Sequence, residues 1–175
     1  YGAMFDGQYE VAMRAARELK NQVPDEMLMS QTDFLDAFMQ MPLHVMIRFG
    51  KWEQILEEPE YPEYRLVSRA VRHYARSISY SALGHTELAR AELNAFHEAA
   101  EVIPDEWYIF NNQVSTVLPI AEAMIQGELL FREGKKEQAF AALREGIAAE
   151  DALIYDEPPG WMLPVRHALG ALLMA

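Results

Sequence analysis

The chain has 175 residues, 51% of them hydrophobic, which is enough to bury the core of one domain. A formal net charge of -12 and the lack of a basic stripe argue against nucleic acid and anionic lipid as partners. The chain has no cysteine, which excludes disulfides, thiolate metal sites and thiol nucleophiles and leaves reducing and oxidising compartments both open.

No membrane or targeting segment is evident in the sequence. Its apolar runs fall short of the roughly 20 residues that span a bilayer, so we expect no membrane insertion. Residues 1–6 are typical of the tail of a helix, and residues 163–175 are typical of a helix without a C-cap residue. We therefore expect a piece truncated at both ends.

Helical periodicity dominates the chain, and glycine and proline punctuate it. Turns are expected near Gly7, Gly50, Gly84 and Gly134, and Pro24 ends the helix after the first turn. Runs of alternating β-branched residues are absent, which predicts an all-α fold. In chain order the expected helices cover residues 1–6, 10–22, 34–45, 53–58, 63–83, 87–102, 107–130, 138–149 and, incomplete, 161–175.

Two prolines fall inside expected helices. Pro42 indicates either a kink in the helix over residues 34–45 or the true first turn of a separate helix. Pro119 indicates a kink in the helix over residues 107–130, or its division into two.

The clearest repeating unit is a helical hairpin with a small residue on each side of its turn, which lets two helices cross closely. The turn glycines are separated by 43, 34 and 50 residues, and 34 is the period of the tetratricopeptide repeat. Residues 1–175 resemble one tetratricopeptide array, which implies antiparallel hairpins stacked as a right-handed solenoid. The small residue, turn glycine and small residue recur at Gly127, Gly134 and Ala139 and again at Ser77, Gly84 and Ala89.

Longer stretches strengthen this resemblance. The segments 41–52, 72–76, 155–161 and 164–170 are similar to parts of a group of long bacterial tetratricopeptide proteins of unassigned function. That similarity implies further repeats on both sides and no reaction. It leaves a bacterial cytoplasm and a periplasm equally open.

Ligands of such arrays usually lie in the concave face, which the first helix of each hairpin lines. Arg48 and Arg132 can present a planar donor fork to a carboxylate of a peptide. Arg48 and His44 share one helix face, as do Arg132 and Glu128, although the latter two also read as an ordinary surface ion pair. The resemblance implies a peptide-binding groove formed by His44, Arg48, Tyr74, Glu128, Arg132 and His167, with Gln40, Ile47, Ile78, Met124 and Phe131 beside them.

The loop over residues 155–161 is a second candidate. Asp156 and Glu157 next to Trp161 suit a cation, a basic peptide end or acid-base work. In the structural interpretation, paired prolines stiffen the loop, Asp156 or Glu157 pairs with Arg166, and Trp161 wedges between hairpins.

Five histidines raise the question of a metal site, but no two of them are paired at the spacing of a helical metal motif. We expect no metal and no cofactor. Convergence of His44, His73 and His167 with Asp156 or Glu157 across the groove stays as an alternative.

The sequence therefore predicts a non-catalytic scaffold that binds a protein or peptide segment. Two other functions remain open. In the first alternative, the chain is a docking or regulatory segment of an enzyme, or is itself a metal-dependent hydrolase. In the second it would be an assembly element that self-associates through the open ends of the array.

Overall fold

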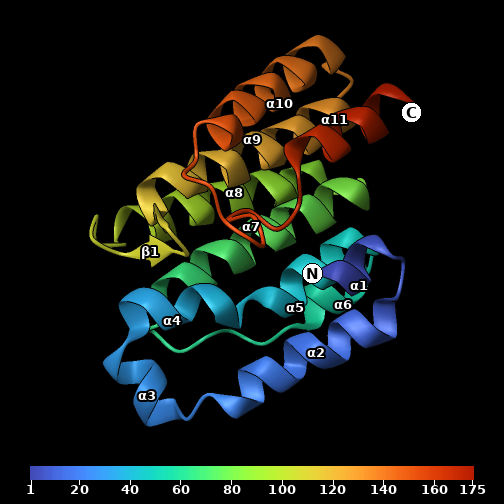
Figure 1. Cartoon of the computed structure of the whole chain (residues 1–175). Coiled ribbons are helices and arrows are strands. Elements are labelled where there is room, and N and C mark those ends of the chain that lie inside the picture. The colour runs from blue at the N-terminus through green and yellow to red at the C-terminus, as the bar shows by residue number, and fades with distance from the viewer.

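The computed structural model describes residues 1–175 and is built mainly of α-helices, as predicted (Figure 1). A small antiparallel β-hairpin interrupts them, with Tyr108 opposite Gln113 and Ile109 opposite Asn112. The elements are α1 (Gly2–Phe5), α2 (Tyr9–Gln22), α3 (Asp25–Ser30), α4 (Thr32–Met39), α5 (Met41–Arg48), α6 (Trp52–Glu57), α7 (Leu66–Ala82), α8 (Thr86–Glu101), β1 (Tyr108–Ile109), β2 (Asn112–Gln113), α9 (Val114–Arg132), α10 (Lys136–Asp151) and α11 (Val165–Leu173).

All four predicted glycine turns are confirmed, because each glycine has a positive φ that other residues rarely adopt. The residue after each glycine donates its N–H to the carbonyl five positions earlier, which closes the Schellman motif of a helix C-terminus. The turns join α1 to α2, α5 to α6, α7 to α8 and α9 to α10. Their φ values are 74° at Gly7, 62° at Gly50, 83° at Gly84 and 77° at Gly134.

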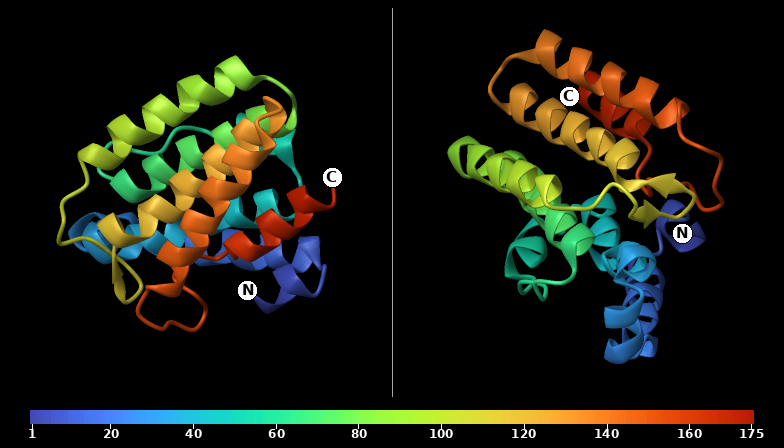
Figure 2. Two further views of the ribbon diagram at one scale, coloured as in Figure 1. Left: turned by 90° about the horizontal axis from the view of Figure 1, so that it is seen from above. Right: turned by 90° about the vertical axis from the view of Figure 1, so that its left-hand side faces the viewer.

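Helices that are neighbours in the chain mostly pack against one another (Figure 2). The hairpin α7–α8 packs on α9, α9 pairs with α10, and α11 lies against both members of that second hairpin. On the other side, α7 contacts α4, α5 and α6, and α2 packs on α5. One contiguous cluster of buried apolar side chains, from Met4 to Leu172, joins these elements.

Small residues hold the two long hairpins together at close range. In α7, Ser77 donates a 2.8 Å hydrogen bond from Oγ to the carbonyl of Ala89 in α8. In α9, a Cβ on Gly127 would lie 2.5 Å from Cγ of Leu143 in α10. Gly127 therefore makes room for Leu143, a neighbour that the expected pairing with Ala139 did not include.

The expected helix start at residues 107–112 is wrong. This stretch forms β1, a turn at Phe110 with φ 55°, and β2, and α9 begins only at Val114. A short apolar run has the same composition in a buried strand as in a helix, so periodicity alone does not separate them. Pro119 lies inside α9 and does not split it.

One open boundary is decided by the structure, and two others differ from the sequence prediction. Pro42 occupies the first turn of α5, so α4 and α5 are separate helices and the second interpretation of this proline is confirmed. The short helix α3 after Pro24 was not predicted. The last helix begins at Val165, and Trp161 precedes it in irregular, buried backbone.

One helix, α9, is long and apolar enough to cross a bilayer, contrary to the expectation that no run approaches that length. Within the protein, 56% of its most apolar window is buried, and the helix packs against α7, α8, α10 and α11. A core helix passes the same test of length and composition, and the packing of α9 is that of a core helix.

Candidate functional site

A pocket of about 340 Å³ opens among the first helices of three successive hairpins. Helices α5, α7, α9 and α11 supply most of its lining. Most of the lining is apolar, and the charged side chains are few. The lining residues are Ile47, Arg48, Trp52, Tyr74, Ile78, Met124, Glu128, Arg132, Leu143, Leu163, Pro164, His167, Ala168, Ala171, Leu172 and Ala175.

Five of the six residues predicted for a peptide-binding groove line this one pocket. They come from four helices and from positions up to 119 apart in the sequence, from Arg48 to His167. Ile47, Ile78 and Met124, which the resemblance placed beside them, line it too. His44, Gln40 and Phe131 do not.

Arg48 and His167 carry no carboxylate partner. The Arg48 guanidinium lies 5.0 Å from the ring centroid of Phe5 in α1, a cation–π contact. The His167 ring, at the exposed start of α11, lies 5.7 Å from the same phenyl ring. The two basic side chains thus converge on one aromatic ring beside the pocket, and their hydrogen-bond donors remain free for a ligand.

Arg132 and Glu128 form the i,i+4 ion pair that the sequence allowed, with Nη2 2.7 Å from Oε1. Arg132 also lies 5.7 Å from the ring of Phe131. Such a pair on a helix surface is worth about 0.3–0.5 kcal/mol, so a ligand carboxylate can compete with Glu128 for this guanidinium.

Tyr74 lies at the buried floor of the pocket. Its hydroxyl is 3.6 Å from Sδ of Met124, a weak hydrogen bond. Burial, with a smaller contribution from the charge of Glu128, raises the pKa of Tyr74 well above its usual range, so the hydroxyl stays protonated.

His44 does not line the pocket, because it is in the protein core with 1% of its surface exposed. Its ring centroid is 5.0 Å from that of Trp161 at an interplanar angle of 87°. Burial lowers the pKa of His44 to about 4, so the ring is neutral at pH 7, and Nδ1 has no hydrogen-bond partner. His44 therefore belongs to the core and is not available to a ligand in the pocket.

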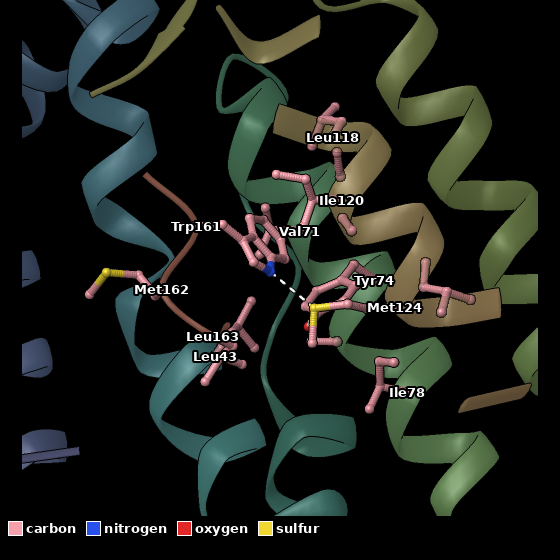
Figure 3. Close-up of a cluster of buried hydrophobic side chains, with 14 of the residues drawn as sticks. Leu43, Val71, Tyr74, Ile78, Leu118, Ile120, Met124, Trp161, Met162 and Leu163 are labelled. Carbon is pink, nitrogen blue, oxygen red and sulfur yellow. Dashed lines mark hydrogen bonds between the residues drawn. The ribbon is translucent and has the colours of Figure 1, made fainter. Parts of the chain in front are cut away.

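The segment Tyr155–Pro164, which we call the strap, covers His44. Trp161, Met162 and Leu163 of the strap are at most 6% exposed and lie between α5 on one side and α7 and α9 on the other (Figure 3). The Trp161 indole donates from Nε1 to Sδ of Met124 at 3.0 Å. Full burial of such a side chain contributes about 1.5–3 kcal/mol, so these three residues are a substantial part of the core.

The acidic residues of the strap have structural partners, and neither lines the pocket. Asp156 accepts hydrogen bonds from the backbone N–H of Asn111 at 3.2 Å and from Nδ2 of Asn112 at 3.1 Å. Glu157 accepts one from the Tyr155 hydroxyl. Arg166 pairs with Asp151 at 2.7 Å rather than with Asp156 or Glu157.

Asn112 is a residue whose role sequence reasoning missed. It is buried at the end of the β-hairpin, where Oδ1 accepts from the N–H of Ile154 at 2.8 Å and Nδ2 donates to the carbonyl of Ile154 at 3.0 Å. It thereby fixes the chain just before the strap. The role of this asparagine could be inferred from the sequence only if a β-hairpin were predicted at this position. The sequence predicted a helix there instead.

A buried charged cluster away from the pocket was also missed. Asp36 of α4 is fully buried and accepts from Nε of Arg65 at 3.0 Å, from the N–H of Ser68 at 2.9 Å and from the Ser68 hydroxyl. The cluster fixes the position of α4 against the start of α7. An aspartate within a helix gives no sequence signal of such a partner, since Arg65 is 29 residues away.

The histidines and carboxylates of the metal alternative are not brought together. His73 pairs with Glu92 at 2.7 Å between α7 and α8, His44 is in the core, and His167 is beside the pocket. No group of three potential ligands is placed to hold a metal ion.

Comparisons of the chain with protein-family models, with curated proteins and with solved structures gave no match. A function for this chain is therefore inferred from the chemistry of the pocket. Its apolar floor can bury a side chain, and Arg48, Arg132 and His167 can hold a carboxylate next to it.

Proposed function

We propose that this chain is a non-catalytic binding scaffold, a tetratricopeptide-like stack of helical hairpins that holds a peptide or protein segment. The observation that carries the proposal is the convergence of α5, α7 and α9 on one pocket. These are the helices that the resemblance assigns to the concave face of an array, where such proteins bind their ligands.

The arrangement of the elements supports the array. Consecutive hairpins contact their neighbours in chain order, and four of the connections share one Schellman geometry. The hairpins differ in length, since α6 has six residues and α8 has 16, so the repeats are irregular.

The charge of the pocket supports a carboxylate in the ligand. The chain as a whole carries -12, yet two arginines and a histidine meet one glutamate here. A local excess of positive charge in an acidic protein favours an anionic group at this place over the rest of the surface. The ligand we propose is a peptide that presents an apolar side chain next to a carboxylate.

The proposal is tested by selecting from a displayed peptide library with the wild-type protein. Arg48→Ala combined with His167→Ala removes the two basic side chains without an acidic partner, and we expect the selected peptides to bind at least about tenfold more weakly. Arg69→Ala combined with His85→Ala is the matched control, because both side chains are exposed and outside the pocket. Equal binding by wild type and the pocket variant would refute the proposal.

A further inference from the structure

The strap lies where a bound peptide would lie. Trp161 contacts His44 and Tyr74, with ring centroids 5.0 and 5.1 Å apart, and both are residues that the groove positions of the array assign to a ligand. Its backbone is irregular and crosses between α5 and α9 (Figure 3). The protein thus fills part of its own groove with the buried apolar side chains of an irregular segment.

Hydrogen bonds fix the strap at both ends. Asp156 is bonded to Asn111 and Asn112 on the β-hairpin side. On the other side, the N–H of Val165 donates to Oε2 of Glu150 at 3.2 Å. Between these points the buried side chains of Trp161 to Leu163 hold the segment against the core.

The pocket begins where the buried part of the strap ends. Leu163 and Pro164 belong to its wall, whereas Trp161 and Met162 do not. Its volume of about 340 Å³ is at the lower limit of the range for small-ligand sites, which start at roughly 300 Å³. What remains of the groove therefore has room for a side chain and the group beside it.

We infer that the strap permanently fills part of the groove and thereby determines which ligands fit the rest. A partner inserts one apolar side chain, flanked by one carboxylate, into the open pocket. Leu163 sets the size of that side chain. This inference rests on the proposed function and adds which residue limits the side chain that the same pocket accepts. The strap stays in place when the partner binds, because the partner occupies only the space beyond Leu163.

The three tryptophans allow a direct test by NMR, using their indole N–H signals. Trp52 lines the pocket, Trp161 is in the strap, and Trp107 is outside both. The probe is N-acetyl-leucine, with N-acetyl-leucinamide as the control that lacks the carboxylate. N-acetyl-leucine should shift the Trp52 signal, leave the Trp107 signal in place and leave the exchange of the Trp161 indole N–H with water unchanged. The same shift of Trp52 should need about tenfold more of the amide.

The possible failures are distinguishable. An exchange of the Trp161 indole N–H with water that rises about tenfold on binding would mean that the probe displaces the strap, and would overturn the inference while leaving pocket binding intact. No shift at Trp52 with either probe would overturn the proposed function, and the inference with it.

A second variant tests the role of Leu163. Leu163→Ala enlarges the pocket, so the affinity for N-acetyl-tryptophan relative to N-acetyl-leucine should rise by about tenfold, the size expected for a change of a methylene or more in an apolar pocket. Leu169→Ala is the control, since Leu169 packs on the core but does not line the pocket. An unchanged ratio in Leu163→Ala would contradict a role for Leu163 in specificity, whereas a merely structural role would lower both affinities together.

Discussion

The imidazole of His44 meets the indole of Trp161 almost at a right angle, with the ring centroids 5.0 Å apart. The two residues are 117 positions apart in the sequence and each is 1% exposed. Their contact connects α5 to the strap, and it turns an expected ligand-binding histidine into part of the core.

Burial of His44 predicts a loss of stability in weak acid. Its pKa falls from the usual 6.5 to about 4 in the folded protein, so below pH 6.5 the unfolded chain takes up a proton that the folded chain does not. The free energy of unfolding should fall between pH 6.5 and pH 4 by about 3 kcal/mol from this group, and level off below pH 4. Urea denaturation at several pH values measures it.

The matched variants for this measurement are His44→Gln and His85→Gln. His44→Gln removes the titrating group, so its unfolding free energy should fall less steeply with acid than that of the wild type. His85 is exposed in a turn, so His85→Gln controls for the loss of a surface histidine. Parallel slopes for His44→Gln and wild type would show that His44 is not buried in its neutral form.

Gly127→Ala should destabilise the protein by about 1–3 kcal/mol, the usual cost of overpacking a core. The new Cβ would lie 2.5 Å from Cγ of Leu143, which is fully buried and has little room to move. Gly170→Ala is the control, because nothing lies within 4 Å of its added Cβ and alanine favours a helix by about 1 kcal/mol. Thermal melting should therefore move in opposite directions in the two variants, and a common direction would contradict the packing of α9 on α10.

Asp36→Asn should cost about 3–5 kcal/mol of unfolding free energy, because it leaves Arg65 buried without its counter-charge. Asp33→Asn, on the exposed side of the same helix, should cost less than about 1 kcal/mol. Chemical denaturation of both variants measures the difference. Similar small losses would argue that the pair between Asp36 and Arg65 does not form.

Asn112→Ala should loosen the strap, since it removes both bonds to Ile154 and one to Asp156. We expect a loss of about 1–3 kcal/mol and faster exchange of the Trp161 indole N–H with water. Asn94→Ala, at an exposed position of α8, is the control. Unchanged exchange in Asn112→Ala would mean that the strap is held without this residue.

The features that could be predicted from the sequence were local ones, such as turns, helix starts and helix faces. Gly50 and Gly134 require a backbone that other residues avoid, so their turns follow from the residue type alone. The first turn of α5 follows from Pro42 in the same way. The positions of Arg48 and Arg132 on one face of their helices follow from helical spacing.

What could not be predicted depends on contacts between distant segments. Nothing near His44 indicates that Trp161 covers it, and nothing near Leu163 indicates that it ends the open part of the groove. The β-hairpin at Tyr108 was missed because a short apolar run suits a strand and a helix equally. The first of these features removes His44 from the proposed site, and the second adds Leu163 to it.

The most direct test of the central claim is an NMR titration of the ¹⁵N-labelled protein with the tightest peptide from the library selection. We predict that the backbone amide shifts cluster on the last turn of α5, the second half of α9 and α11, around Arg48, Arg132 and His167. Shifts that cluster instead on other exposed apolar residues, such as Met29 of α3 or Tyr155 of the strap, would contradict the account.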